Sequence, residues 1–183
     1  MALREVLQFP DPRLKRKSEP VTEVTDALRE LAADMAEVMY DEPGIGLAAP
    51  QVGEAVRLIV IDTEWPEEDQ ERDPLVVVNP ELSDPEGKLS WNEGCLSVPD
   101  FEAEVARAET ITLRGHDLDG NPLEERASGL RAVCFQHEVD HLDGLLFIDR
   151  LSRLQRTLSA KKRRKQLRLE EEESGPLQRG RTL

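Results

Sequence analysis

The stretch Gln136-His137-Glu138-Val139-Asp140-His141 contains the pattern His-Glu-x-x-His and predicts a metal-binding helix at the centre of the fold. Histidines four positions apart project from one face of an α-helix, one turn from each other. Two imidazoles at that spacing can bind one divalent metal ion, and the adjacent glutamate can act as a general base toward water. The stretch therefore indicates metal-assisted hydrolysis, although such pairs also occur by chance or form structural metal sites.

The flanking residues predict where this helix begins and ends. Ser128 is a candidate N-cap, and Leu130, Val133, Cys134 and His137 fall on one face. Asp143-Gly144 follows as a stop signal, because glycine readily takes the left-handed position after a helix. Together these signals predict one helix of about fourteen residues.

A catalytic site of this kind needs a third protein ligand and an open position for water. His116 lies in a predicted hairpin tip, which favours a solvated side chain. Cys134 lies one turn before His137, but its apolar neighbours favour a small buried residue. Cys95 follows Gly94 at a predicted bent strand end, and a thiolate suits ferrous iron, zinc or cobalt. Chemistry alone favours Cys95 only slightly and leaves the other candidates open.

Three blocks of sequence together resemble the peptide deformylase family. They are residues 44–51 (Gly-Ile-Gly-Leu-Ala-Ala-Pro-Gln), residues 93–97 (Glu-Gly-Cys-Leu-Ser) and the histidine stretch. The blocks occur in the order and spacing of that family, and residues 10–14 and 18–21 resemble its opening segment. The resemblance covers roughly residues 3 to 150. The three blocks together are more specific than any one of them. The glycine-rich block alone could be read as a phosphate loop, but it lacks the Lys-Ser/Thr ending of that motif.

The resemblance implies a hydrolase that removes the N-formyl group from the N-terminal formylmethionine of nascent polypeptides and releases formate. Cys95, His137 and His141 would hold one divalent metal ion, commonly Fe²⁺, with Zn²⁺, Ni²⁺ or Co²⁺ as substitutes in a purified sample. Glu138 would take a proton from the attacking water and deliver one to the departing amine.

The resemblance also assigns the groups that contact the substrate. The amide of Gln51 and the backbone N–H of Leu96 would donate hydrogen bonds to the oxyanion of the tetrahedral intermediate. The glycines of the first block are expected to adopt unusual dihedral angles and to lie against the peptide. Apolar residues near the blocks would line a pocket for the methionine side chain, although ordinary core packing remains an alternative for Val133. The residues expected to bind the substrate are Gly44, Ile45, Gly46, Leu96, Val133 and Cys134.

Two other functions remain as alternatives. A metallopeptidase that cleaves internal peptide bonds would use the same metal centre, but the blocks around Gln51 and Cys95 favour the formyl substrate. A non-enzymatic ribosome-associated protein with a structural metal site would not need Glu138. Comparing the turnover of formylated and unformylated peptides would distinguish a deformylase from the metallopeptidase. A substitution of Glu138 would distinguish it from the non-enzymatic protein.

The rest of the chain predicts an α+β fold, with antiparallel β-sheets packed around the central metal-binding helix and with N-terminal and C-terminal helices. A helix is expected over residues 25–40, and strands over 56–61, 75–78 and 110–113 and around Val105. Residues 64–74 are expected to form an acidic loop, and Asp119-Gly120 a tight turn. With 183 residues and 38% apolar content, we expect one catalytic domain over residues 1–150.

Charge is distributed unevenly. The chain has 38 acidic and 24 basic side chains, for a net charge of −14, which disfavours general binding to DNA. Residues 150–169 nevertheless hold nine basic side chains and no acidic one. Residues 151–169 are expected to form a basic helix, either simply solvated or, as in some members of the resembled family, in contact with ribosomal RNA. Residues 170–183 are expected to form a disordered tail.

No membrane or export signal is expected. No run approaches eighteen apolar residues, and the N-terminal residues lack the apolar segment of a signal peptide. The two cysteines, Cys95 and Cys134, both lie near the predicted site and do not suggest a disulfide framework. A cytoplasmic location is the expectation that follows.

Overall fold

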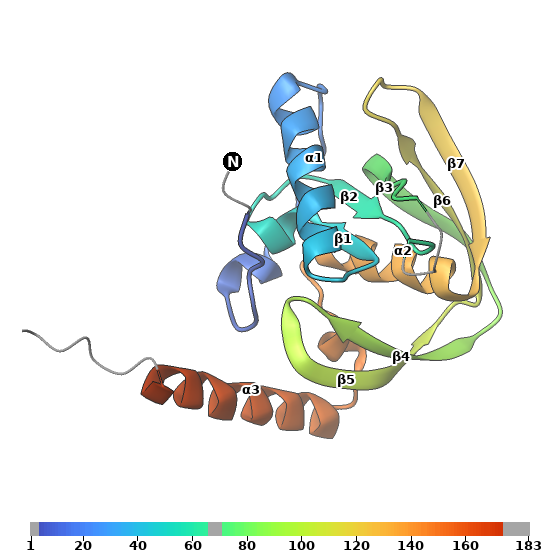
Figure 1. Cartoon of the computed structure of the whole chain (residues 1–183). Helices are drawn as coiled ribbons and strands as arrows, with labels where there is room; N and C mark the ends of the chain where they lie inside the picture. Colours follow the sequence, from blue (N-terminus) through green and yellow to red (C-terminus); the bar gives the residue numbers. More distant parts are fainter. Residues whose placement is uncertain (1–3, 66–70, 174–183) are drawn as a thin grey trace, which may run out of the picture.

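The computed structural model describes residues 4–65 and 71–173, and it is an α+β fold built on antiparallel strands (Figure 1). Five strands form one sheet in the order β1-β2-β3-β6-β7, and β4 and β5 form a separate hairpin. This confirms the predicted fold class. The strands are β1 (Gly46–Ala48), β2 (Leu58–Ile61), β3 (Leu75–Glu86), β4 (Leu89–Cys95), β5 (Val98–Arg107), β6 (Thr110–His116) and β7 (Pro122–Ser128). The helices are α1 (Asp26–Asp41), α2 (Gly129–Leu142) and α3 (Arg153–Glu173), with short 3₁₀ turns η1 (Pro12–Lys15), η2 (Ala49–Val52) and η3 (Phe147–Arg150).

Helices cover both faces of the sheet at β1 and β2. The α1 helix packs on β1 and β2, and α2 packs on β1, β2, β3, β6 and β7. All four residues of β2, Leu58–Ile61, are therefore buried. This explains why the strand is a continuous apolar run rather than an alternating pattern, which is typical of strands covered on both sides.

The α1 helix begins at the predicted position. Thr25 is its N-cap, and its side-chain oxygen accepts from the backbone N–H of Leu28 at 3.3 Å. Leu28, Leu31, Met35 and Met39 are buried along one face, as the helical spacing predicts. The helix therefore covers the sheet with its apolar stripe and leaves its charged face outside.

The α2 helix spans fourteen residues, as predicted. Ser128 occupies the N-cap position in an extended conformation, as predicted, but its side chain makes no capping hydrogen bond. Gly129, the first residue of the helix, follows at φ +59°, a left-handed conformation that glycine adopts without a steric penalty. At the other end Gly144 lies at φ +73°, as predicted, and a Cβ there would lie 2.5 Å from the Lys15 carbonyl oxygen.

The strands beyond β2 are longer than predicted. The β3 strand reaches Glu86 with two irregularities in its pairing to β6, and β5 begins at Val98. Asp117 accepts backbone N–H bonds from Asp119 and Asn121, which fixes the predicted turn before β7. Irregular pairing weakens the period-two pattern, so the full strand lengths were not evident from the sequence.

The α3 helix lies beside β5 at the edge of the molecule (Figure 1). It runs to Glu173, four residues beyond the predicted end, and the expected tail from residue 174 lies outside the described residues. Ser159 and Arg163 are buried, and Arg163 donates to the Phe9 carbonyl at 3.1 Å and to Gln8 Oε1 at 2.6 Å. One face of α3 is therefore docked against the body. None of the helices in the described ranges has the length and apolarity needed to cross a bilayer.

Candidate metal centre and active site

Cys95, His137 and His141 meet in the space between the β4–β5 hairpin and α2. Their ligand atoms all lie within 4.8 Å of one another. Cys95 ends β4, where the pairing with β5 shifts register between Glu93 and Cys95. This irregularity is the bent strand end that the sequence predicted. By contrast, the alternative His116 is exposed at the end of β6 and takes no part in the cluster.

This cluster fits a divalent metal ion. The Nε2 atoms of His137 and His141 are 3.3 Å apart, and Cys95 Sγ lies 3.3 Å from His141 Nε2. Ligands about 2.0–2.3 Å from a tetrahedral ion are separated by roughly 3.3–3.6 Å, so the spacing agrees. One thiolate and two imidazoles form a donor set suited to iron, zinc or cobalt. Burial lowers the pKa of His141 well below its usual value, which favours the neutral, ligating imidazole.

A buried charge network orients His137. Its Nδ1 donates to Glu93 Oε2 at 2.8 Å, which directs Nε2 toward Cys95 and His141. Burial alone would raise the pKa of Glu93, but two hydrogen bonds from Arg107 hold it at about 2. Arg107 also donates to Asp140 at 2.6 Å, and both side chains are buried. Sequence reasoning missed Arg107 and Asp140, because nothing local shows that β5 and α2 meet there.

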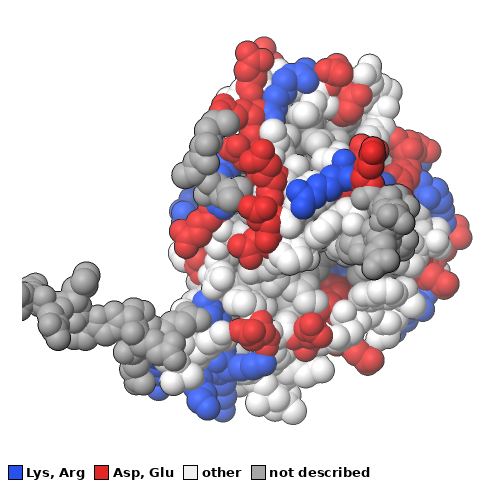
Figure 2. Space-filling view, in the orientation of Figure 1, with Lys and Arg blue, Asp and Glu red and all other residues white. Residues whose placement is uncertain are grey.

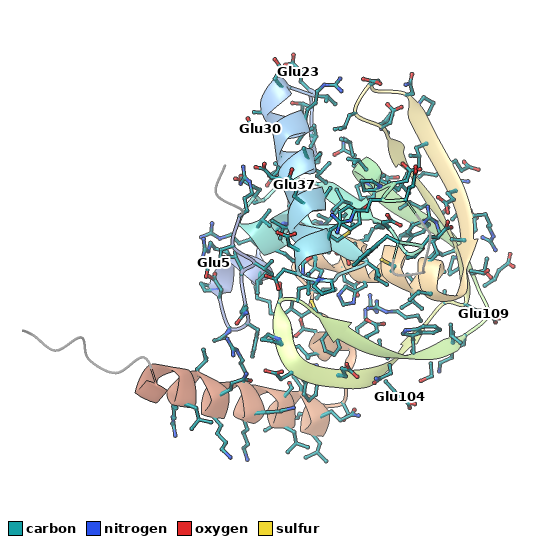
Figure 3. The ribbon with its side chains drawn as sticks, in the orientation of Figure 1. Glu5, Glu23, Glu30, Glu37, Glu104 and Glu109 are labelled. Carbon is teal, nitrogen blue, oxygen red and sulfur yellow. The ribbon has the colours of Figure 1, made fainter. Side chains whose placement is uncertain are left out.

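Glu138 lies buried beside the cluster. Its Oε2 atom has no hydrogen-bond partner among the described residues. Burial raises the pKa of Glu138 to about 7, whereas a cation held by the three ligands would lower it again. The exposed glutamates labelled in Figure 3 differ, since Glu23, Glu30 and Glu37 lie around α1 and Glu104 lies on the outer side of β5. Glu138 is therefore a carboxylate whose proton affinity depends both on its burial and on the charge held by the neighbouring ligands.

Gly44 and Gly46 lie at the site without the unusual dihedral angles that the sequence predicted. Neither glycine lies at positive φ, so the expectation of unusual dihedral angles is wrong. Their lack of a Cβ allows close approach instead. A Cβ on Gly44 would lie 3.0 Å from Leu96 Cδ1, and a Cβ on Gly46 would lie 2.5 Å from Glu138 Oε1 and 2.8 Å from Cys134 Sγ. Gly46 therefore leaves the space that the Glu138 carboxylate occupies.

Gly46→Ala is expected to lower kcat on the order of 10²-fold, because displacing a reacting group by about 1 Å has an effect of that size. Gly94→Ala is the control, since a Cβ there would meet Glu102 Cγ at an ordinary 3.5 Å. Steady-state kinetics with a formylated peptide would compare the two. Similar losses in both variants would contradict this role of Gly46.

Gln51 points its amide at the same cluster. Its Oε1 accepts from the Ala48 backbone N–H at 2.8 Å, which fixes the orientation of the amide. Its Nε2 lies 3.2 Å from Ser97 Oγ and 3.7 Å from Cys95 Sγ. The side chain is buried at 2% exposure, so this donor is held in place rather than solvated. Ser97, which was not singled out from the sequence, shares the contact.

A cavity of about 920 Å³ opens over these groups. Its walls come from β1, the β4–β5 hairpin and α2, and one side is reached by Lys162 of α3. Val133 and Cys134 are buried and line this cavity. Burial raises the pKa of Cys134 well above its usual value, so this thiol stays protonated. The predicted site residues that line the cavity are Gly44, Ile45, Gly46, Gln51, Cys95, Leu96, Val133, Cys134, His137 and Glu138.

An antiparallel sheet wrapped around a His-Glu-x-x-His helix, with a cysteine completing the ligand set beside a buried carboxylate, defines a metal-dependent hydrolase. The family model of polypeptide deformylase matches residues 3–157 of the chain. The chain therefore belongs to the peptide deformylase family, and it is a metal-dependent hydrolase that removes the N-formyl group from nascent polypeptides.

Similar proteins cover almost the whole chain. A peptide deformylase of Zymomonas mobilis is 55% identical over 176 residues, which is 94% of this chain and 99% of that protein. Among solved structures, a peptide deformylase of Legionella pneumophila is 43% identical with a TM-score of 0.85, covering 92% of this chain and 98% of the other. One from Ehrlichia chaffeensis in complex with actinonin is 36% identical with a TM-score of 0.84, covering 91% and 98%.

Proposed function

We propose that Cys95, His137 and His141 hold the metal ion of this deformylase and that Glu138 moves the protons of the reaction. The convergence of one sulfur and two ring nitrogens beside a buried carboxylate carries this proposal. A divalent ion bound there would lower the pKa of a water molecule from about 15.7 toward roughly 7 and would polarise the formyl carbonyl. We also propose that residues 1–150 form the catalytic unit.

Glu138 accepts a proton at its carboxylate as water attacks the formyl carbon. It then delivers a proton to the nitrogen that becomes the free amine. Its burial beside the ligand cluster supports this role, because burial raises the pKa of the carboxyl group whereas a cation held there would lower it, and the balance lets the group both take and give a proton. Glu93 assists indirectly by holding the ring of His137 in one orientation.

Gln51 and Leu96 stabilise the oxyanion that forms on the formyl oxygen. The Gln51 amide donates from Nε2, and Leu96 donates from its backbone N–H in the turn after Cys95. The fixed orientation of the Gln51 side chain supports this assignment, because a donor already aimed at the site needs no reorganisation. The substrate peptide lies along Gly44, Ile45 and Gly46, and its methionine side chain packs near Leu96, Val133 and Cys134.

Fe²⁺ is the proposed native metal, and the cytoplasm is the proposed location. A soft thiolate with two imidazoles supports a ferrous site, although the same donors also accept Zn²⁺, Ni²⁺ and Co²⁺. Purification without oxygen, followed by metal analysis and a formate-release assay on a formylmethionyl peptide, tests the function. Turnover of the formylated peptide, with no cleavage of an unformylated one, is the expected result.

We further propose that α3 contacts the ribosome through its exposed basic face. Lys161, Lys165 and Arg168 are exposed at helical spacing, whereas the docked face carries Ser159 and Arg163. In Figure 2 the basic side chains gather where α3 lies, and acidic ones dominate the region of α1. Such a separation of charge suits a polyanion that approaches α3 from outside.

The charge reversal Lys161→Glu/Lys165→Glu/Arg168→Glu is expected to weaken ribosome binding at least about tenfold. The slope of the logarithm of the binding constant against the logarithm of salt concentration should become shallower by roughly two. Turnover of a free formylated peptide should not change. Reversing the exposed Arg16, Lys17 and Lys88 provides a matched control. Equal binding by both triple variants in co-sedimentation with ribosomes would contradict the proposal.

A further inference from the structure

Gly44 contributes only backbone atoms to the wall of the cavity. Gly44 has no side chain, and β1, which begins two residues later, pairs only with β2 among the described strands. The backbone N–H of Gly44 donates to the Met39 carbonyl at 2.8 Å, and the Ile45 carbonyl accepts from the Asp62 N–H at 2.9 Å. These two bonds hold the segment on either side of the Gly44 carbonyl oxygen, and the partner of that oxygen fixes the remaining freedom of the peptide group between Gly44 and Ile45.

That partner is the indole of Trp65. Trp65 Nε1 donates to the Gly44 carbonyl oxygen at 2.7 Å, across 21 positions of sequence. The other side of Gly44 faces the hairpin, where a Cβ would lie 3.0 Å from Leu96 Cδ1. Gly44 is thus placed between the indole and the β4–β5 turn, and its position sets the width of the cavity at this point. Trp65 itself does not line the cavity.

Contacts with Asp62, Tyr40 and Arg72 fix the position of Trp65. The buried Asp62 accepts from the backbone N–H groups of Glu64 and Trp65, at 3.2 and 3.1 Å, and from the Tyr40 hydroxyl at 2.7 Å. The Tyr40 and Trp65 rings pack edge to face, with centroids 5.4 Å apart. The Arg72 guanidinium lies over both rings, 4.6 Å from the Tyr40 centroid and 5.7 Å from that of Trp65. These contacts remove most of the rotational freedom of the indole.

We propose that Trp65 is a positioning residue for the formylated peptide, acting through the Gly44 carbonyl. Its N–H holds the 44–46 segment in the orientation that receives the peptide, so binding does not have to order this segment first. The inference rests on the proposed course of the peptide along Gly44, Ile45 and Gly46. Among the described residues, Trp65 makes no hydrogen bond or ring contact with the metal ligands or Glu138, so we expect its effect on substrate binding rather than on the chemical step.

Trp65→Phe removes the donor and keeps an aromatic ring. We expect KM for a formylmethionyl peptide to rise about five- to tenfold, which corresponds to the net contribution of one hydrogen bond, with kcat within about twofold. A second variant carries 3-benzothienylalanine at position 65, which keeps the two fused rings and replaces the N–H by sulfur. It should show the same rise in KM with nearly unchanged stability.

Tyr40→Phe is the matched control. It removes the hydroxyl bond to Asp62 and so loosens the same cluster, but it leaves the indole bond to Gly44 intact. We expect it to lower the free energy of unfolding with little change in KM. An unchanged KM in both Trp65 variants would overturn the proposal. So would an equal rise in KM for Tyr40→Phe at equal loss of stability, because the effect would then be general loosening.

These outcomes are separate from a failure of the proposed function. If the unmodified chain did not release formate from the peptide, the proposed function would fail before any variant was compared. If it did release formate, the KM and kcat values of the variants, compared at matched stability, decide the role of Trp65. A fall in kcat with constant KM in the Trp65 variants would also contradict a positioning role.

Discussion

Glu138→Gln is expected to lower kcat by about 10²–10⁴-fold while the chain keeps its metal ion, because only the group that exchanges protons is changed. Glutamine preserves the size of the side chain beside Gly46 but cannot accept a proton at neutral pH. Formate release under saturating substrate measures the rate. Metal analysis of the same sample shows whether the centre is intact.

Glu104→Gln is the matched control, since it makes the same chemical change on an exposed side chain outside the cavity (Figure 3). It should leave kcat and metal content unchanged. A normal rate for Glu138→Gln would reject Glu138 as the proton carrier and would favour a structural metal site. Loss of metal together with rate would show that Glu138 supports the centre instead.

Cys95→Ala should weaken metal binding by more than 100-fold, whereas Cys134→Ala should retain the metal. Mutation of a residue that only orients a metal ligand typically lowers metal affinity about 10–100-fold. The effect should be larger for Cys95, because it supplies a ligand atom itself. Cys134 lies in the same cavity wall but is outside the cluster of ligand atoms, and its sulfur contacts the Ile45 carbonyl at 3.6 Å. Competition with a chromogenic chelator under anaerobic conditions measures both affinities.

Equal metal loss in the two cysteine variants would show either that the wrong thiol was assigned or that both thiols bind. Stability provides the necessary check, because Cys134 is buried and its truncation leaves a small void. If Cys134→Ala lost metal only in proportion to its unfolded fraction, the assignment of Cys95 would stand.

Local sequence pattern was enough to predict the metal helix. The i, i+4 spacing placed His137 and His141 on one face, and Gly144 marked the end of α2, as the structure confirms. The thiol was harder to choose, because Cys95 reaches the helix only through the irregular end of the β4–β5 hairpin. Residue chemistry left three candidates open, and the family resemblance favoured Cys95.

Other features depend on contacts between distant segments. Arg107 joins Glu93 of β4 to Asp140 of α2, and no periodicity in any of the three segments reveals that pairing. The same holds for Trp65, which lies in a region predicted only as an acidic loop and yet reaches Gly44. Ser128 was predicted correctly as the N-cap, but neither the absence of its capping hydrogen bond nor the left-handed conformation of Gly129 was evident from the sequence.

X-ray absorption spectroscopy at the metal edge of the anaerobically purified chain tests the central claim most directly. We expect one metal ion per chain, with one sulfur ligand near about 2.3 Å and two imidazole nitrogens near about 2.0–2.1 Å, in a sample that releases formate from a formylmethionyl peptide. Replacing Cys95 should remove the sulfur contribution. An active sample whose metal had no sulfur ligand, or whose sulfur signal survived Cys95→Ala, would contradict it.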